Sequence, residues 1–298
     1  MSSSRYKGIP WRRFIEFVSL KSDRFNIINE LLKEAELEFS TPEISGNRHF
    51  IIRPNQDPAS QENPDIPPVI LVAHYDRYEG SPGANDNSAA VFILLETAIR
   101  LNKTGSKNWL IIFTDKEELK PGEGILSQGA YTLAKGFKSL KMTRAKIFCF
   151  DVCGTGDSII ISTTLDYLLT RESGSVKMQR ALASLRNIAL ETAKELRTVN
   201  AFMAPTPFSD DAGFFRAGLA AQTITVLPVR EYSRLSAELR KNEKFTEVLV
   251  NSELWKSHPN KSIPETWQVL NSPKDSHVRL TPENFRLIVR FAHALAGG

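Results

Sequence analysis

Acidic side chains and one histidine stand at the ends of apolar runs in this 298-residue sequence. His74 and Asp76 close one run as AHYD, and Asp151 follows another as FDVC. Asp86 lies in GANDN just before a helical pattern, and the acidic group DKEE at residues 115–118 follows a third run. Each has an ordinary explanation on its own: a strand-end histidine, a helix N-cap or a solvated acidic loop. Four such ends in succession indicate a shared site instead.

The residue types at these ends suit a divalent metal ion. One histidine with several carboxylates is a donor set for one or two such ions, and zinc is the leading candidate. Glu117 and Glu118 repel each other unless a cation balances them, and one of the two can bind a metal while the other transfers a proton. Asp76 can hydrogen-bond to the ring of His74 and orient it. The pattern therefore predicts metal-assisted chemistry.

Apolar runs alternate with amphipathic helical patterns along most of the chain, and this alternation predicts the elements that position these residues. Buried strands are predicted at 68–74, 108–115, 145–154, 157–163 and 220–227. Helices are predicted at 22–37 with Ser22 or Asp23 as N-cap, at 88–101, at 177–196, and in a C-terminal segment capped by Thr281. The fold class is therefore α/β, with a largely parallel sheet covered on both faces. Ligands bind beyond the carboxyl ends of the strands in such sheets, which is where the acidic groups lie.

The segment 230–267 disturbs the alternation. It is rich in charged residues and is predicted to be partly helical. The chain contains no internal repeat or low-complexity tract, so we interpret this segment as an insertion within a single domain that spans residues 1–298. A lid over the site and a contact between the subunits of a homo-oligomer are both open alternatives for it.

Composition excludes several classes of protein. The 38 basic and 34 acidic residues leave a net charge of +4, and no aromatic-basic platform or helix-turn-helix pattern indicates nucleic-acid binding. No apolar run approaches the roughly 20 residues of a membrane helix. Cys149 and Cys153 are too few for a disulfide framework, and we expect reduced, buried thiols. Since the N-terminal residues contain no apolar signal-peptide region, we expect a cytoplasmic protein.

Six motifs occur in the order typical of one enzyme family: AHYD, GANDN, DKEE, FDVCG, FSDDAGFF and NSPKDS. From about His74 to the C-terminus the chain resembles the M28 family of zinc metallopeptidases, of the aminopeptidase and glutamate carboxypeptidase type. The resemblance implies a zinc-exopeptidase-like, three-layer sandwich with a central mixed, largely parallel sheet of about eight strands. It also implies an exopeptidase, most naturally an aminopeptidase, that acts on a peptide or a small amino-acid-derived substrate.

The resemblance carries metal-binding roles over to individual residues. His74 and Asp151 would bind one zinc, Asp86 would bridge two zinc ions, and Glu118 would bind the second. The family pattern ends with a histidine that completes the second zinc site, but this chain has Asn271 there. An amide oxygen is a weaker zinc ligand than an imidazole.

Four outcomes are open at the second metal site. Asn271 ligates and gives a weaker site, the enzyme works with one metal, a nearby histidine substitutes, or the centre is inactive. The candidate histidines are His277 and His258, the latter in the 230–267 segment.

The resemblance also implies catalytic and substrate-binding roles. Glu117 would be the general base that deprotonates the attacking water, and Asp76 would orient His74. The loop with Asp210 and Asp211 would help to shape the substrate pocket. Asp211, where relatives often have histidine, either faces the solvent or favours a positively charged group of the substrate.

Three hypotheses for function follow from these motifs. The first is a metal-dependent aminopeptidase or related peptidase. The second is a glutaminyl-cyclase-like acyltransferase, because such enzymes share the fold and use a single zinc. The third is a non-catalytic binding protein that keeps the fold, and the intact set of acidic residues argues against it.

Overall fold

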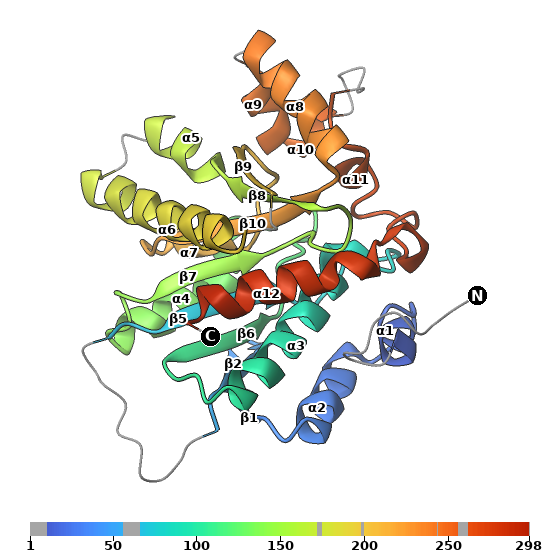
Figure 1. Ribbon diagram of the computed structural model, residues 1–298, viewed down its shortest axis with the longest axis vertical. Helices are drawn as coiled ribbons and strands as arrows, with labels where there is room; N and C mark the ends of the chain where they lie inside the picture. The colour runs from blue at the N-terminus through green and yellow to red at the C-terminus, as the bar shows by residue number, and fades with distance from the viewer. Residues whose placement is uncertain are drawn as a thin grey trace.

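An eight-stranded mixed sheet forms the centre of the molecule, with strand order β1-β4-β6-β5-β7-β10-β8-β9 (Figure 1). The computed structural model describes residues 11–55, 66–171, 175–197, 200–242, 244–255 and 262–297. The strands are β1 (Glu38–Ser40), β4 (Phe50–Arg53), β5 (Val69–His74), β6 (Trp109–Thr114), β7 (Lys146–Phe150), β8 (Ser158–Ser162), β9 (Asn200–Ala204) and β10 (Ala221–Leu227). A separate hairpin pairs β2 (Glu43–Ile44) with β3 (Asn47–Arg48).

The helices fall between the strands along most of the chain. They are α1 (Trp11–Phe17), α2 (Arg24–Glu34), α3 (Ala89–Lys103), α4 (Gly129–Ser139), α5 (Thr164–Arg171), α6 (Val176–Glu195), α7 (Asp210–Arg216), α8 (Val229–Lys241), α9 (Phe245–Val250), α10 (Ser252–Trp255), α11 (Glu265–Gln268) and α12 (Phe285–Leu295). Short helical turns lie at η1 (Ala84–Ser88), η2 (Ile125–Ser127), η3 (His277–Arg279) and η4 (Pro282–Asn284). The observed architecture confirms the predicted α/β class and the eight-stranded, largely parallel sheet.

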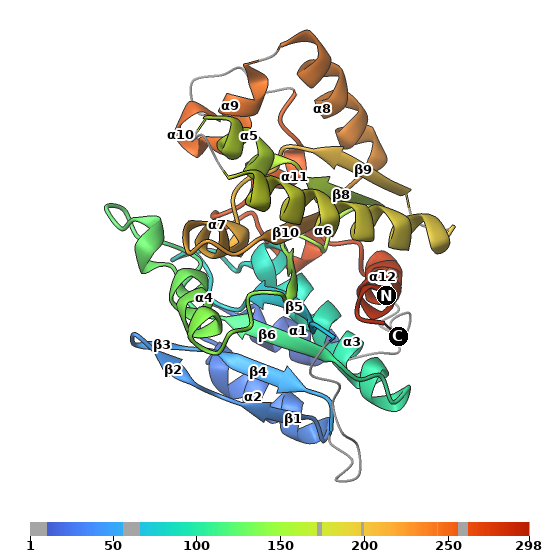
Figure 2. The ribbon, with the colours of Figure 1, turned by 90° about the vertical axis from the view of Figure 1, so that its left-hand side faces the viewer.

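The four central strands run parallel, because β5 pairs in parallel with β6 and β7, and β7 pairs in parallel with β10. Antiparallel pairs join β4 to β6 and β8 to β10. Side chains alternate along β5: Leu71 and Ala73 pack toward α3 and α12, whereas Ile70 and Val72 pack toward α4 and α7. Figure 2 shows these two helical layers on opposite sides of the sheet. Burial on both faces explains why the central strands are continuous apolar runs.

The N-terminal helices join the same core. Phe14 and Phe17 of α1 lie 5.0 and 5.4 Å from the ring of Phe92 on α3. Each buried aromatic ring of this kind contributes about 1.5–3 kcal/mol by leaving water. Asp23 caps α2 as predicted, accepting a hydrogen bond from the backbone N–H of Asn26.

The segment 230–267 contains most of α8 and the helices α9, α10 and α11, which gather at the top of Figure 1. Leu235, Phe245 and Trp267 pack there against Ile160 and Leu227 of the sheet. The interpretation of this segment as an insertion in one domain stays a prediction, as does its role as a lid or a subunit contact. His258 lies outside the described residues.

Several expectations need correction. The hydroxyl of Thr281 does not cap the C-terminal helix: it accepts a hydrogen bond from the N–H of Gly156 at 2.9 Å. Residues 282–284 form the turn η4 before α12 begins. The short elements α1, β9 and α7 were not predicted, because seven residues or fewer leave little periodicity to detect.

The cysteines match expectation. Cys149 and Cys153 are both free and buried, and burial raises the pKa of each thiol well above its usual value. Within the described ranges, no helix combines the length and apolar character that a membrane span requires.

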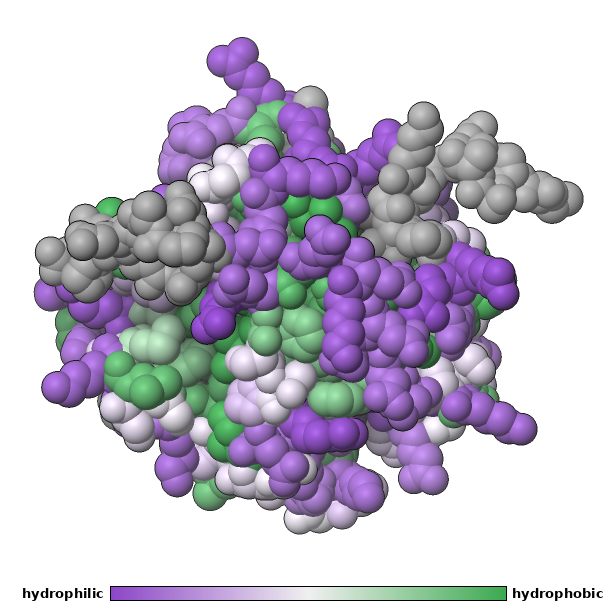
Figure 3. Space-filling view, turned by 90° about the horizontal axis from the view of Figure 1, so that it is seen from below, coloured by the Kyte–Doolittle hydropathy of each residue, from purple (hydrophilic) through white to green (hydrophobic). Residues whose placement is uncertain are grey.

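Seen from below, the end of the molecule with α2 and β1 is mostly hydrophilic, with smaller hydrophobic areas between the polar ones (Figure 3).

Candidate metal centre

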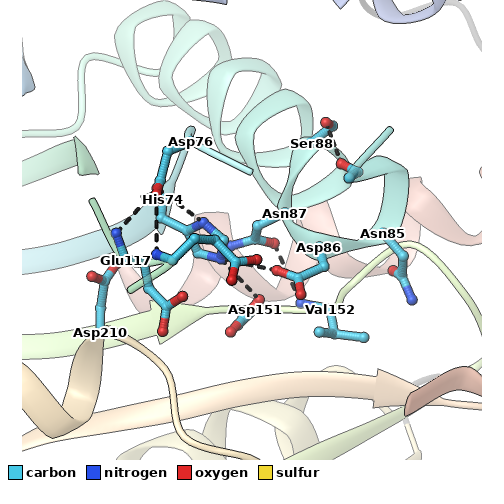
Figure 4. A network of polar contacts seen from close by, with 12 residues as sticks. His74, Asp76, Asn85, Asp86, Asn87, Ser88, Glu117, Asp151, Val152 and Asp210 are labelled. Carbon is cyan, nitrogen blue, oxygen red and sulfur yellow. Dashed lines mark hydrogen bonds and ion pairs between the residues drawn. The ribbon is translucent and has the colours of Figure 1, made fainter. Parts of the chain in front are cut away.

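His74 is fully buried at the end of β5 and faces three carboxylates (Figure 4). Its Nε2 lies 3.1 Å from Oδ1 of Asp86 and 3.5 Å from Oδ1 of Asp151. Its Nδ1 lies 3.3 Å from Oδ1 of Asp76. One ring nitrogen therefore points at two candidate metal ligands, and the other points at the residue predicted to orient the ring.

The sheet register places His74 beside Asp151. Val72 of β5 pairs with Cys149 of β7, so two further residues along these parallel strands bring positions 74 and 151 to the same edge. The backbone then turns at Val152, whose φ of 54° is unusual for a β-branched residue. The side chain of Asn87 stabilises this turn, because its Oδ1 accepts the N–H of Val152 at 3.3 Å and its Nδ2 donates to the carbonyl of Phe150 at 2.8 Å.

The turn that presents Asp86 depends on a distant residue. The carboxylate of Asp275 accepts the backbone N–H of Asn85 at 2.8 Å and that of Asp86 at 3.0 Å. The Asp86–Asn87 peptide bond is cis. Gly83 begins the turn with φ 57°, and a Cβ there would lie 2.6 Å from the Asp86 carbonyl oxygen. The backbone therefore requires glycine at this point.

Asp76 joins the histidine to the acidic group after β6. Its two carboxylate oxygens accept the backbone N–H groups of Glu117 at 3.2 Å and Glu118 at 3.0 Å. Both amides point the same way because Lys116 adopts a left-handed conformation, with φ 59°. Gln128 holds the side chain of Glu117 by donating from Nε2 to Oε1 at 3.2 Å. One carboxylate thus positions both the His74 ring and the backbone of the predicted base.

Negative charge accumulates at this edge of the sheet. Burial, followed by mutual repulsion among the carboxylates, raises the pKa of Asp86 and Glu117 and raises the pKa of Glu118 to about 9. Burial opposes charge on His74 too, but Asp151, Asp76 and Asp86 more than offset it and raise the pKa of His74 well above its usual value. A bound cation would relieve the repulsion within such a cluster.

Three ligand atoms lie close enough together to hold a metal ion. His74, Asp86 and Asp151 each offer one atom, all within 4.8 Å of one another, and we call these residues the metal trio. Tetrahedral zinc with bonds of about 2.0–2.2 Å would separate neighbouring ligand atoms by about 3.3–3.6 Å. The contacts of 3.1 and 3.5 Å from Nε2 are close to that range. Nε2 of His74 and Oδ1 of Asp151 are buried without a hydrogen-bond partner, so the trio fits a zinc ion.

Comparison with known proteins identifies the family. The sequence pattern described as peptidase family M28 matches residues 58–277, which is most of the chain. The chain belongs to peptidase family M28. Aminopeptidase YwaD of Bacillus subtilis strain 168 is 36% identical over 99 residues, or 33% of this M28 chain and 20% of that protein.

Solved structures share the fold at low sequence identity. BSAP, a zinc aminopeptidase from Bacillus subtilis, superposes with a TM-score of 0.55 at 20% identity, covering 83% of this chain. The chain corresponds to only 49% of BSAP, so it spans about half of that protein. A glutaminyl cyclase from Porphyromonas gingivalis superposes with a TM-score of 0.60 at 11% identity, covering 95% of this chain and 94% of the cyclase.

The second predicted metal position of this M28 chain differs from the metal trio. The Oε1 of Glu118 is buried without a hydrogen bond and its carboxyl is repelled by that of Asp86, but Glu118 is not one of the three clustered ligands. Asn271 is exposed and left-handed, with φ 55°. His277 is half-buried in the turn that follows. The ligand roles of Glu118, Asn271 and His277 stay predictions.

Asp210 and Asp211 lie in the first turn of α7, not in a loop, and both are buried. Of the two alternatives for Asp211, the solvent-facing one is therefore wrong: its Oδ1 accepts the N–H of Ser209 at 3.2 Å at the start of the helix. Asp210 accepts a hydrogen bond from the hydroxyl of Thr114 at 2.6 Å. Burial raises the pKa of each carboxyl to about 7. Their substrate-binding roles stay predictions.

A cavity of about 400 Å³ opens beside Glu117, between the start of α4 and α7. Its wall is mainly apolar, with Leu119, Ile125, Phe208 and Phe215 among the lining residues. The cavity gives the candidate base access to a bound molecule.

Sequence reasoning missed the supports of the site. The roles of Gln128, Asn87 and Asp275 were not predicted, although GANDN and NSPKDS were recognised as motifs. The signal for Asp275 is its place in the recognised motif NSPKDS, but that motif does not show which amides the carboxylate holds. Nothing in the sequence around Gln128 distinguishes it from a surface glutamine.

Proposed function

We propose that this M28 chain is a zinc-dependent aminopeptidase in which Glu117 acts as the general base. The observation that carries the proposal is the metal trio, with Asp76 linking its histidine to the backbone of Glu117. The cavity beside Glu117 supports a peptide or amino-acid-derived substrate, because its apolar wall can accommodate a side chain.

His74, Asp86 and Asp151 would hold the zinc. The ion would supply Lewis-acid polarisation of the scissile carbonyl and a lowered pKa for water. Glu117 would accept the proton of the attacking water and deliver it to the leaving amine. Gln128 restricts the Glu117 carboxylate through one hydrogen bond.

We propose that the metal trio is the stronger of the two metal positions. We also propose that the trio holds a single ion. The other side of Asp86 would have Glu118 and the weak amide ligand of Asn271. The exposure of Asn271 supports this ranking, because water competes with an exposed side chain for the metal ion.

Substitution of the base tests the proposal. We expect Glu117→Gln to lower kcat for aminoacyl p-nitroanilides by about 10²–10⁴-fold while the bound zinc is retained. Glu123→Gln is the matched control, because Glu123 is a glutamate of the same loop that forms an ion pair with Lys116 at 3.0 Å. Full activity of Glu117→Gln would show that another group is the base.

A glutaminyl-cyclase-like acyltransferase is the second candidate. The observation that favours it is the extent of the superposition, which covers 94% of the Porphyromonas gingivalis glutaminyl cyclase and 95% of this chain. Peptides with N-terminal glutamine separate the candidates. Release of ammonia with formation of pyroglutamate would support the cyclase, and release of the free amino acid would support the aminopeptidase.

A further inference from the structure

Arg24, the first residue of α2, points its guanidinium into the protein toward the loops of the metal centre. It is 6% exposed. Its Nη1 donates to the carbonyl oxygens of Tyr75 at 2.9 Å and Asp76 at 3.0 Å. Its Nη2 donates to the carbonyl oxygen of Pro82 at 2.7 Å and to the hydroxyl of Ser88 at 2.8 Å. One side chain therefore connects two loops that are separate in the sequence.

Helix α2 itself gives no reason for this arginine. A positive charge in the first turn of a helix is opposed by the partial positive charge of the N-terminal amides. Burial of a guanidinium costs several kcal/mol unless its donors are paired. The ring of Phe17, 4.6 Å from the guanidinium carbon, stabilises the charge, and the loop oxygens accept its hydrogen bonds. These contacts lie on the side of the metal centre. They account for an arginine at position 24, which the helix itself does not favour.

The two connected loops carry the ligands. Tyr75 and Asp76 directly follow His74, while Pro82 and Ser88 enclose the turn that presents Asp86. The distance of 3.1 Å between Nε2 of His74 and Oδ1 of Asp86 depends on how these loops are set against each other. The planar fork of arginine suits this task, since it spreads several donors over a fixed geometry.

We propose that Arg24 is a positioning residue of the metal centre, which holds the His74 and Asp86 loops at the separation that a metal ion requires. The inference rests on the proposed metal-dependent function. Arg24 lies outside residues 58–277, the part of the chain that matches the family pattern, so the N-terminal helices become part of the site's support.

The experiment compares three variants of the full chain. Arg24→Met removes the hydrogen bonds but keeps an unbranched apolar side chain, and Arg24→Lys keeps the charge without the fork. Arg77→Met is the matched control, because Arg77 also connects the loop after His74 to the N-terminal helices. Its side chain donates to the carbonyl oxygens of Ser19 at 2.8 Å and Leu20 at 2.6 Å, between α1 and α2. Zinc affinity is measured by competition with a chromogenic chelator, and the visible absorption of the Co²⁺-loaded protein reports ligand geometry.

We expect Arg24→Met to weaken zinc binding by about 10–100-fold, the usual effect of losing an outer support of a metal ligand. Its Co²⁺ spectrum should shift, and Arg24→Lys should lie between it and the wild type. Arg77→Met should lower the unfolding temperature of the metal-free protein but change the zinc Kd by less than about threefold, far less than the loss of an outer support.

Unchanged zinc affinity and an unchanged Co²⁺ spectrum in Arg24→Met would overturn the inference, even if stability fell. An equal loss of affinity in Arg77→Met would also overturn it, because docking of the helices would then be the cause. If Arg24→Met fails to fold, Arg24→Lys decides by the same two measurements. A wild-type protein that binds no zinc would instead contradict the proposed function.

Discussion

The two sides of Asp86 are built differently. On one side, His74 and Asp151 lie at the ends of adjacent parallel strands, fully or almost fully buried, and their positions follow from the sheet register. The predicted ligands of the other side are Glu118, which follows a left-handed turn, and Asn271, which lies exposed in a loop. Ligands fixed by paired strands lose little freedom when they bind an ion, whereas loop ligands must be ordered at a cost in entropy. The strand side should therefore dominate metal binding.

The largest expected effect comes from the strand side. We expect Asp151→Asn to weaken zinc binding by more than about 100-fold, because a direct ligand loses its charge. This loss exceeds the roughly 10–100-fold effect of removing a residue that only supports a metal ligand. Glu118→Gln should weaken it far less. Competition with a chelator of known affinity measures both. Equal losses in the two variants would show that the two sides of Asp86 bind metal equally.

Removal of the turn's support should have an intermediate effect. Asp275→Asn keeps the size of the side chain but replaces one acceptor oxygen by an amide group, so one N–H of the Asn85–Asp86 pair loses its partner. We expect zinc affinity to fall by about 10–100-fold. Asp157→Asn, near the same edge but bonded to Val229, is a suitable control. An unaffected zinc Kd in Asp275→Asn would mean that the Asp86 turn is stable without this carboxylate.

A gain of ligand strength on the loop side should have a smaller effect. Histidine tolerates the left-handed conformation of Asn271 better than most residues, so the backbone of Asn271→His should be preserved. We expect a second zinc ion to bind, at least tenfold more weakly than the first because its site lies in loops. Native mass spectrometry counts the ions. One ion per chain at saturating zinc would show that residue 271 does not approach the site.

The smallest effect concerns pH. Burial raises the folded-state pKa of Asp210 and Asp275 to about 7 and that of Glu118 to about 9, so the folded protein binds more protons than the unfolded chain above pH 4. The unfolding free energy of the metal-free protein should fall as pH rises through this range. We expect the unfolding temperature to decrease by roughly a few degrees between pH 5 and 8. Zinc should reduce this decrease, because it compensates the ionised carboxylates. A rising unfolding temperature in scanning calorimetry would contradict this account.

The predictable parts of the molecule are those with short-range signals. Strands β5, β6 and β7 were predicted because both faces are covered and their apolar runs are continuous. The proximity of His74 and Asp151 was predictable because parallel strand ends meet at one edge. These rules need only a few consecutive residues.

The unpredicted parts depend on partners far along the chain. Arg24 contacts carbonyl groups 51 to 59 positions away, and Asp275 contacts an amide 190 positions away. Exposure to solvent was one of the two alternatives for Asp211, but the residue is enclosed at the start of α7. Local sequence carries no record of such pairings. Asn271 differs from these residues, because a local feature accounts for it. Its backbone is left-handed, a conformation that asparagine adopts readily, so no metal is needed to explain the residue type.

The hydrogen bonds of Asp275 set an order of events during biosynthesis. A ribosome has made the strands, His74, Asp86 and Asp151 well before it reaches residue 275. Until that residue emerges, the amides of Asn85 and Asp86 lack the carboxylate that holds their turn. A nascent chain can therefore form much of its sheet while its metal ligands are still loosely arranged. We expect tight zinc binding to be acquired late, after the sheet has formed and residue 275 has emerged.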